Sequence, residues 1–331
     1  MIRKVARPIK HLLIDPIRLR MKAISQSILL SKEPPIPIQY ELSGEATPVS
    51  KHWNVHTVAT KIIRSAKESI EYNSWIAKEY PLYHELMNLY EGYDDEVVLE
   101  YGCGPANDLV GFLHYSNAKK VIGMDVSETG LKIASHRLAL HDFDPDRIKL
   151  ILISESVADI PLEDNSIDYI HSQGVLHHTS NEEDILKELY RVLKHGKEAR
   201  VMVYNYNSVF THLWLAYKRM ILDDAFPNMT LDEAFTQSTD GENCPISRNN
   251  RPEEYIARCN SAGFETEYLG GYFNKYELIW LKDFKEKALA DERLAPEHRQ
   301  FLSDLTYDEN GYPLYQGKHA GVGGVYVLRK D

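Results

Sequence analysis

Strand-like and helix-like segments alternate along the middle of the chain, and this alternation constrains the fold more than any other feature. Five short apolar runs have the length of buried strands: Val97–Tyr101, Lys120–Val126, Lys149–Ser154, Ser166–Ser172 and Ala199–Tyr204. Helical segments lie between them. In the clearest one, residues 180–196, the apolar side chains recur at helical spacing: Ile185, Leu186, Leu189, Val192 and Leu193. Strands that alternate with helices of this length predict βαβ units and a parallel sheet.

The ends of the helix within residues 180–196 carry their own signals. Ser180 and Glu183 have the spacing of a capping box, in which each side chain bonds to a backbone amide at the start of the helix. Gly196 stands where a helix end favours a left-handed residue.

Two later strand-like segments, Phe264–Tyr272 and Gly324–Lys330, predict an antiparallel, hairpin-like edge. We therefore expect an α/β fold with a doubly wound, mostly parallel sheet of seven strands, N-terminal helices and a helical lid. The expected organisation is a basic N-terminal extension and linker at 1–50, a helical cap at 51–94, a core at 95–205, a helical and loop insertion at 206–263, and the late strands at 264–331 with a helical insertion at 273–320.

The turn after the first core strand reads EYGCGPAN, residues 100–107, with Gly102 and Gly104 one residue apart. A glycine turn between a strand and a helix predicts a site for a nucleotide-like ligand. The spacing lacks the Gly-Lys-Ser/Thr of a phosphate-binding loop. A dinucleotide site requires a third glycine close to the pyrophosphate, where this chain has Asn107. An NAD-dependent oxidoreductase is therefore disfavoured.

The segment VLEYGCGPA, residues 98–106, with Glu100 two residues before the first glycine, resembles the class I S-adenosylmethionine-dependent methyltransferases. The resemblance spans residues 97–204, about a third of the chain, and departs from the family at Ala106, where many members have glycine. It implies a Rossmann-like core with S-adenosyl-L-methionine as cofactor. This cofactor has no phosphate and carries a sulfonium and an ammonium group, which an acid such as Glu100 favours electrostatically.

The same resemblance implies which residues hold the cofactor. Asp125, at the end of the second strand, would accept the ribose hydroxyls, with Val126 beside it. The adenine would meet Glu155, Ser156 and Val157, although Ser156 stands where the family has an acid. The full expected set is Glu100, Gly102, Cys103, Gly104, Asp125, Val126, Glu155, Ser156, Val157 and, for the methionine part, Gln173.

The segment GVLHHT supplies the candidate catalytic residues, His177 and His178. An ordinary histidine pKa near ~6.5 suits a general base. We expect an acceptor site outside the core that uses Tyr204, Asp240 and Arg251. Aromatic residues dense enough to form a stacking wall precede and follow the core: Trp53, Tyr72, Trp75, Tyr80, Tyr83, Tyr204, Tyr206 and Trp214.

These features predict a methyltransferase that acts on a small hydroxylated acceptor, with O-methylation of a sugar or glycan precursor ahead of a natural product or quinol-like acceptor. A cofactor-binding protein without transfer activity is the main alternative. The net charge of −11 argues against nucleic acid as a partner, because phosphate binding needs a basic face.

The charge is uneven, since residues 1–33 carry eight Lys and Arg against two acids. Residues 1–30 are expected either to touch an anionic membrane surface weakly or to form a helix that folds onto the body. No stretch approaches the ~18 apolar residues of a membrane span. Three widely spaced cysteines favour a reducing compartment and no metal cluster, so we expect a cytoplasmic protein. The sequence makes no prediction of oligomeric state.

Overall fold

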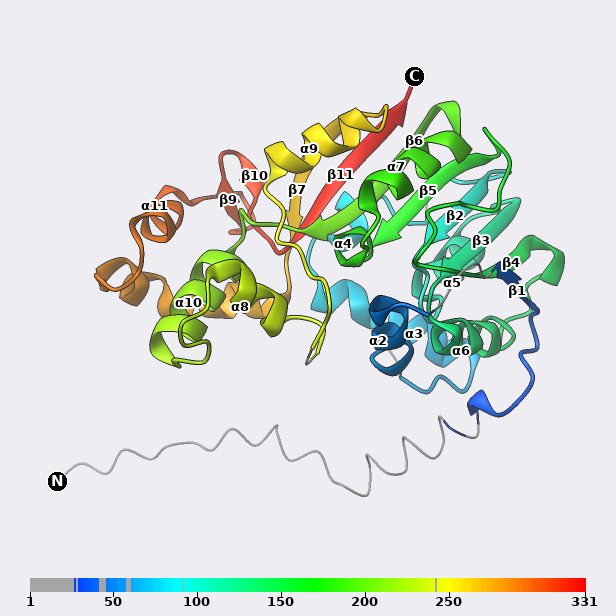
Figure 1. Cartoon of the computed structure of the whole chain (residues 1–331), viewed down its shortest axis with the longest axis horizontal. Helices are drawn as coiled ribbons and strands as arrows, with labels where there is room; N and C mark the ends of the chain where they lie inside the picture. Colours follow the sequence, from blue (N-terminus) through cyan, green and yellow to red (C-terminus); the bar gives the residue numbers. More distant parts are fainter. Residues whose placement is uncertain (1–26, 28, 42–45, 58–60, 91, 242) are drawn as a thin grey trace.

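The computed structural model describes residues 27, 29–41, 46–57, 61–90, 92–241 and 243–331. Its centre is an eight-stranded sheet in the order β1-β4-β3-β2-β5-β6-β11-β7 (Figure 1). Its strands are β1 Ile38–Glu41, β2 Val97–Tyr101, β3 Lys120–Asp125, β4 Ile148–Ile153, β5 Ile167–Gln173, β6 Leu193–Tyr204, β7 Glu265–Tyr272 and β11 Gly323–Lys330. Only β11 runs antiparallel to its neighbours, β6 and β7. The predicted doubly wound, mostly parallel sheet with an antiparallel pair at one edge is confirmed.

The eighth strand is β1, which lies within the segment predicted to be an extended linker. It pairs parallel to β4, with Ile38 opposite Leu150. The preceding Ile36 is buried, and its backbone N–H and C=O both bond to the Ser135 hydroxyl, at 2.9 and 2.8 Å. Prolines are tolerated at the start of edge strands. The prolines before Ile38 therefore obscured a strand that the edge of β4 stabilises.

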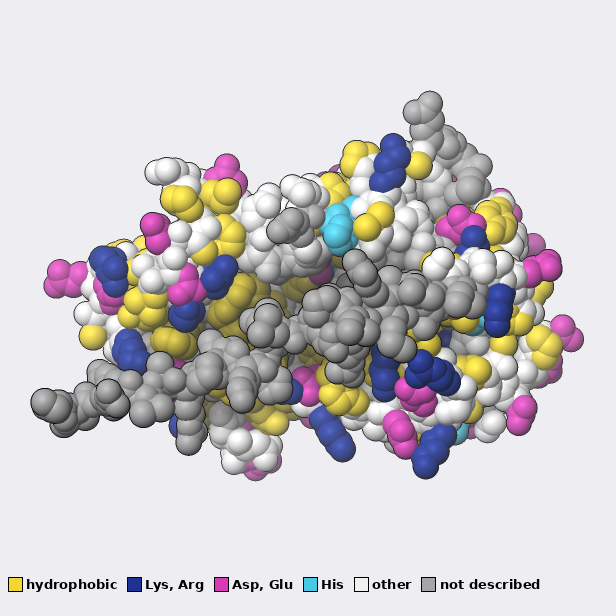
Figure 2. All heavy atoms as spheres, turned by 90° about the horizontal axis from the view of Figure 1, so that it is seen from below, with side chains coloured by type: hydrophobic (Ala, Val, Ile, Leu, Met, Phe, Trp, Pro, Cys, Tyr) yellow, Lys and Arg dark blue, Asp and Glu magenta, His cyan; other side chains and the backbone are white. Residues whose placement is uncertain are grey.

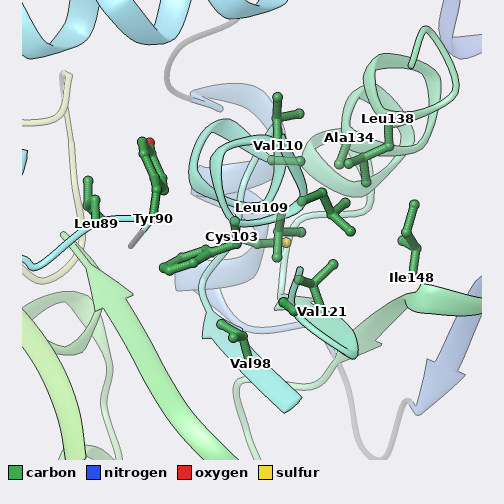
Figure 3. Close-up of a cluster of buried hydrophobic side chains, with 14 of the residues drawn as sticks. Leu89, Tyr90, Val98, Cys103, Leu109, Val110, Val121, Ala134, Leu138 and Ile148 are labelled. Carbon is green, nitrogen blue, oxygen red and sulfur yellow. The ribbon is translucent and has the colours of Figure 1, made fainter. Parts of the chain in front are cut away.

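Helices cover both faces of the sheet. On one face, α5 (Asn107–Tyr115) and α6 (Glu128–Leu138) pack on alternate strand residues such as Val98 and Val121 (Figure 3). On the other face, α7 (Glu182–Val192) and α9 (Pro252–Ser261) pack on the residues in between, including Leu99 and Ile122. Successive side chains of a strand point to opposite faces. The buried apolar runs of the sequence therefore produce a three-layer core.

Helix α7 confirms the predicted apolar stripe. Ile185, Leu186, Leu189 and Val192 are all buried against the sheet, and burial of each side chain contributes roughly 2 kcal/mol. The predicted capping box is wrong. Asn181 occupies the N-cap without a side-chain bond, and the Ser180 amide and hydroxyl both donate to Glu155 Oε1.

The predicted helix end at Gly196 is also wrong. The helix ends at Val192, and Gly196 lies within β6, although its φ of 71° is the left-handed conformation expected of it. Leu193, predicted to be the last apolar residue of the helix, is instead the first residue of β6 and is buried.

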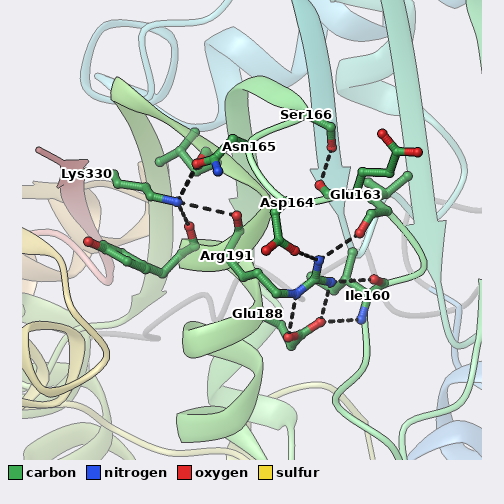
Figure 4. A network of polar contacts seen from close by, with 11 residues as sticks. Ile160, Glu163, Asp164, Asn165, Ser166, Glu188, Arg191 and Lys330 are labelled. Carbon is green, nitrogen blue, oxygen red and sulfur yellow. Dashed lines mark hydrogen bonds and ion pairs between the residues drawn. The ribbon is translucent and has the colours of Figure 1, made fainter.

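Two cationic side chains, Arg191 of α7 and Lys330 of β11, connect the end of α7 to neighbouring segments (Figure 4). The Arg191 guanidinium donates to the Ile160 carbonyl at 2.8 Å and to the Glu188 carboxylate at 2.7 Å. The Lys330 ammonium group, at the end of β11, donates to the Leu193 carbonyl at 2.8 Å. A planar guanidinium can satisfy several acceptors at once. The segment between β4 and β5 is thereby fixed against α7, near its expected adenine contacts.

The remaining elements lie around the carboxyl ends of the strands. The N-terminal helices are α2 Pro48–Val55, α3 Ala66–Glu79 and α4 Tyr83–Leu86. A π-helix, Phe210–Leu222, together with α8 Leu231–Ser238, α10 Lys275–Ala290 and α11 Pro296–Asp304 forms what we call the lid. Residues 273–320 were predicted to be a helical insertion. Besides helices they form a small sheet of β8 Thr306–Tyr307, β9 Pro313–Tyr315 and β10 Lys318–His319.

The lid has an apolar outer face. Hydrophobic side chains gather over the part of the molecule that carries α8, α10 and α11 (Figure 2), and the exposed ones include Leu222, Met229, Tyr276 and Ile279. Across the described residues, no helix combines the length and apolar character needed to cross a bilayer. The predicted membrane contact of residues 1–30 falls almost entirely outside the described residues.

Candidate active site

A cavity of about 440 Å³ lies at the carboxyl ends of the central strands. Its wall includes the glycine turn after β2, Asp125 at the end of β3 and Gln173 at the end of β5. Chain order in the sheet reverses at β2, with β3 on one side and β5 on the other. Ligands of open α/β sheets bind at such switch points. Residues of α2, α3 and the lid close the cavity from the outside.

The glycine turn is tied to β3 by its backbone. The Gly102 and Cys103 amides donate to the Met124 carbonyl at 2.8 and 2.9 Å, and the Gly104 amide donates to Asp125 Oδ2 at 2.7 Å. All three turn residues line the cavity as predicted. Ala106, where the family resemblance departs, has a left-handed φ of 62°. Glycine adopts that conformation without strain, which explains its occurrence there in relatives.

Gly102 is the turn residue that most needs to be glycine. Its φ is +82°, and an added Cβ would lie 2.1 Å from Val175 Cγ2 and 2.9 Å from Val175 Cβ. A rotamer change at Val175 moves Cγ2 but leaves Cβ in place, so the backbone itself must shift.

We expect Gly102→Ala to lower the affinity for S-adenosylhomocysteine by about tenfold or more, since a shift of the turn costs at least ~1.4 kcal/mol of binding energy. Gly104→Ala is the matched comparison, because Gly104 also has a positive φ of +47° but nothing within 4 Å of its added Cβ. Calorimetric titration of both variants checks this. Equal losses in the two variants would show that backbone strain alone matters and that the Val175 contact does not.

Asp125 couples the glycine turn to the start of α6. Its Oδ1 accepts from the Ser127 amide at 2.7 Å, while Oδ2 holds the Gly104 amide. Burial raises the pKa of Asp125, and the amides of Ser127 and Gly104 oppose that shift by stabilising the carboxylate. Each carboxylate oxygen retains acceptor capacity toward the cavity. Val126 also lines the cavity.

Glu100 presents an unsatisfied oxygen beside the glycine turn. The side chain is 4% exposed and lines the cavity, and its Oε2 has no hydrogen-bond partner among the described residues. Burial first, and then the charge of Asp108, hold the pKa of Glu100 well above its usual range. A buried carboxyl oxygen without a partner is costly. This oxygen is therefore suited to a cationic or hydrogen-bond-donating group in the cavity.

Behind Glu100, Asp108 organises a buried hydrogen-bond network. Its carboxylate accepts from Tyr83 Oη at 2.5 Å and Tyr90 Oη at 2.7 Å, and lies 3.2 Å from His171 Nε2. Burial alone would raise the pKa of Asp108, but these hydrogen bonds outweigh it and lower the pKa. Glu100, Asp108 and His171 each have one atom able to bind a metal ion, and these three atoms lie within 4.8 Å of one another. Because Asp108 is already satisfied, we interpret the cluster as a network that joins α4 to α5.

Only some of the residues expected to contact the adenine and methionine parts of the cofactor line the cavity. Glu155 lines the cavity, whereas Ser156 and Val157 do not. Ser156 is exposed, and its hydroxyl lies 2.7 Å from that of Ser154. Gln173 lines the cavity and donates from Nε2 to Tyr272 Oη at 2.8 Å. The assignment of these residues to parts of the cofactor stays a prediction.

Three residues predicted separately meet on one side of the cavity. His178 Nε2 lies 3.5 Å from Asp240 Oδ2, which also accepts from Tyr204 Oη at 2.8 Å. His178 Nδ1 lies 2.6 Å from the Ile246 carbonyl. A carbonyl only accepts, so we assign the proton to Nδ1 and the lone pair to Nε2. Burial lowers the pKa of His178, although the Asp240 charge opposes this shift. The histidine is thus a neutral base.

His177 and Arg251 lie elsewhere. His177 is fully buried outside the cavity wall, and neither ring nitrogen has a partner among the described residues. Its ring packs 4.2 Å from that of Tyr204. The Arg251 guanidinium lies 3.5 Å from the centre of the Tyr206 ring, also outside the wall. The structure thus brings His178 but not His177 or Arg251 into the cavity wall, and the catalytic and acceptor-binding roles of these residues stay predictions.

Aromatic side chains dominate the rest of the wall. Six of the eight predicted for a stacking wall line the cavity: Trp53, Tyr72, Trp75, Tyr80, Tyr83 and Tyr204. Tyr206 and Trp214 do not. Phe210 and Tyr272 line the cavity and were missed by the sequence analysis. Tyr272 could have been found from its place at the end of a predicted strand, where the carboxyl ends of the sheet meet.

Comparison with known proteins agrees with this geometry. Residues 99–200 match a family model described as a methyltransferase domain. Residues 99–200 therefore form a methyltransferase domain. The predicted resemblance to methyltransferases is confirmed. A segment of 108 residues, 33% of this chain, is 32% identical to the tRNA U34 carboxymethyltransferase of Pseudoalteromonas atlantica. The matched part spans about a third (32%) of that relative's length.

Solved structures are similar to this chain at low sequence identity. One is phosphoethanolamine N-methyltransferase 2 of Haemonchus contortus in complex with phosphomonomethylethanolamine and S-adenosylhomocysteine, with a TM-score of 0.50 and 13% identity over 86% of this chain and 61% of that chain. Another is a possible histamine N-methyltransferase of Thermotoga maritima, with a TM-score of 0.44 and 19% identity over 80% of this chain and 97% of that chain.

The cavity fits the cofactor of this family, S-adenosylmethionine. Glu100 offers its unsatisfied oxygen to a cationic group, and the backbone of Gly102 lies in the cavity wall without a side chain. Asp125 presents carboxylate oxygens and Gln173 an amide to the cavity, and their contacts with the ribose and the methionine part stay predictions. When bound, the cofactor supplies a methyl group activated by a cationic sulfur.

Proposed function

We propose that the protein is an enzyme that moves the methyl group of S-adenosylmethionine to a hydroxyl of a small acceptor, specifically in O-methylation of a sugar or glycan precursor. The observation that carries the proposal is the His178–Asp240–Tyr204 group, which lines the same aromatic cavity as the glycine turn. A hydroxyl acceptor must lose a proton, and His178 Nε2 is the base positioned to take it.

Each member of the group has a role in that proton transfer. The acceptor hydroxyl would give its proton to His178 Nε2 as its oxygen forms a bond to the methyl carbon, while the bond from that carbon to sulfur breaks and S-adenosylhomocysteine leaves. The Asp240 carboxylate stabilises the imidazolium that results, and the Tyr204 hydroxyl holds Asp240 in place. The aromatic wall excludes water and holds the acceptor in line with the reacting carbon. Aromatic faces beside hydrogen-bonding groups also suit the faces and hydroxyls of a sugar ring.

A natural product or quinol-like acceptor uses the same wall and is the second choice. The relative from Pseudoalteromonas atlantica is named for action on tRNA. We favour a small molecule, because a phosphate polymer needs basic contacts and the chain carries a net charge of −11. The test below can also show that the protein binds the cofactor without transferring its methyl group. We further propose that the protein is cytoplasmic.

The experiment is incubation of the full chain with methyl-labelled S-adenosylmethionine and three acceptor groups: sugars, quinols and tRNA. We expect label on a sugar hydroxyl, and a background level with His178→Gln. Label on tRNA alone would contradict the small-molecule proposal. No label on any acceptor, with S-adenosylhomocysteine still bound, would favour the non-catalytic alternative.

A further inference from the structure

The charge of the cavity wall carries information about the acceptor. Five acidic side chains line the cavity: Glu100, Asp108, Asp125, Glu155 and Asp240. Among the described residues that line it, none is a lysine or an arginine. A ligand that enters the cavity therefore meets carboxyl groups and aromatic rings, with no cationic side chain from the described wall.

Asp240 differs from the other four acids in its partners. Asp108 and Asp125 each hold at least two donors from the chain, and Glu155 holds the Ser180 amide and hydroxyl. Glu100 lies at the glycine turn, on the cofactor side. The Asp240 carboxylate has the Tyr204 hydroxyl and, at 3.5 Å, the neutral His178 ring. It is the acid on the base side of the cavity with capacity for a further donor.

Three arginines that lie outside the cavity wall are engaged in other contacts. Arg251 stacks on Tyr206, as described above. Arg248 lies 3.5 Å from the Glu182 carboxylate. The Arg137 guanidinium is buried behind the Tyr72 ring, 5.6 Å from its centre, and donates to Ser69 and Asn73. Rotating any of these arginines into the cavity would break contacts that the structure already makes.

We propose that the cavity selects its acceptor by charge: the part of the acceptor that enters is neutral or positively charged, and Asp240 sets this preference by accepting a hydrogen bond from a hydroxyl or ammonium group. This inference rests on the proposed function, because it concerns the acceptor of that reaction. Like charges repel strongly where water is excluded, whereas a hydrogen bond from an ammonium group to a carboxylate is among the strongest in proteins. Acceptors that place a phosphate, sulfate or carboxylate inside the cavity are excluded.

Asp240 can be tested without disturbing its loop. Its φ of 58° is left-handed, a conformation that asparagine tolerates as well as aspartate. The His52 ring bonds to the Asp240 carbonyl at 3.0 Å and holds the backbone independently of the side chain. The amide oxygen of asparagine can still accept from Tyr204. Asp240→Asn therefore removes the charge and keeps the shape. Asp232→Asn, on the exposed surface of α8, is the matched control.

The experiment measures binding of matched ligand triples to the full chain saturated with S-adenosylhomocysteine, by ligand-detected NMR. Each triple consists of an amine, an alcohol and a carboxylate that share one ring scaffold. The first is glucosamine, glucose and glucuronate, the second is tyramine, tyrosol and 4-hydroxyphenylacetate, and similar sets use other rings. We expect the carboxylates to bind about tenfold more weakly, or worse, than their neutral partners, which corresponds to ~1.4 kcal/mol. Asp240→Asn should reduce this gap, and Asp232→Asn should leave it unchanged.

Carboxylates that bind as well as their neutral partners would overturn the inference. So would a charge preference that Asp240→Asn leaves intact, or a library in which no member binds. The proposed function fails in a different way, through loss of S-adenosylhomocysteine binding or of methyl transfer, and both are measured separately from this preference.

Discussion

Replacing His178 by glutamine is expected to slow methyl transfer to a hydroxyl acceptor by roughly 100- to 10,000-fold, the usual contribution of a general base. The affinity for S-adenosylhomocysteine should stay unchanged, because the base lies on the acceptor side of the cavity. Steady-state kinetics with the acceptor found by labelling, together with calorimetry, separate the two effects. His114→Gln, on the exposed end of α5, is the control and should retain wild-type rates.

The pH profile distinguishes a base from a packing residue. Burial lowers the pKa of His178, so the imidazole stays neutral below the ordinary histidine value of ~6.5. A base must be neutral to accept a proton, so wild-type activity should persist below pH ~6.5 and fall only as the pH drops through the lowered pKa. The His178→Gln variant should lose that acidic limb. A variant with full activity, or an unchanged acidic limb, would rule out His178 as the base.

Replacing Asp125 by alanine is expected to weaken binding of S-adenosylhomocysteine by about 100-fold or more. A hydrogen bond to a charged group contributes ~1.5–3 kcal/mol, and the carboxylate can accept from two ribose hydroxyls. The same change releases the Gly104 and Ser127 amides, so the turn loses part of its support as well. Calorimetric titration measures the affinity.

Asp168→Ala is the matched control for that change. Asp168 lies on β5, which β2 separates from β3 in the sheet, and it holds Lys194 at 2.8 Å and the Val97 amide at 3.0 Å, outside the cavity wall. The Asp168→Ala variant should have a lower melting temperature and the same affinity for S-adenosylhomocysteine as the wild type. Wild-type affinity in Asp125→Ala would show that the ribose assignment is wrong.

The sheet could be predicted from the sequence because its strands carry their own signals. Runs such as Val97–Tyr101 are buried on both faces and flanked by turn residues, so the pattern identifies them without knowledge of their neighbours. Strand β1 lacks such a signal, since only Ile38 of its four residues is even partly buried. It forms because β4 offers an open edge, and this tertiary effect leaves no periodicity in the sequence.

The functional site also has a part that the sequence predicts and a part that it does not predict. Glu100, Gly102 and Gly104 are close in sequence, and Asp125 ends the next strand, so one motif and one strand end place them together. The meeting of His178 with Asp240 depends on how the lid folds back over the sheet, and no local pattern encodes that. The sequence also could not show which of His177 and His178 lines the cavity, because adjacent residues of a short turn point in different directions.

We conclude that the cofactor held by the glycine turn is S-adenosylmethionine rather than a dinucleotide. Thermal unfolding of the full chain with S-adenosylhomocysteine, with NAD and with neither ligand tests it most directly. A ligand that binds only the folded state at 100 times its dissociation constant stabilises that state by about 2.7 kcal/mol, which raises the melting temperature measurably. We predict this rise with S-adenosylhomocysteine and none with NAD. Stabilisation by NAD alone would contradict the account.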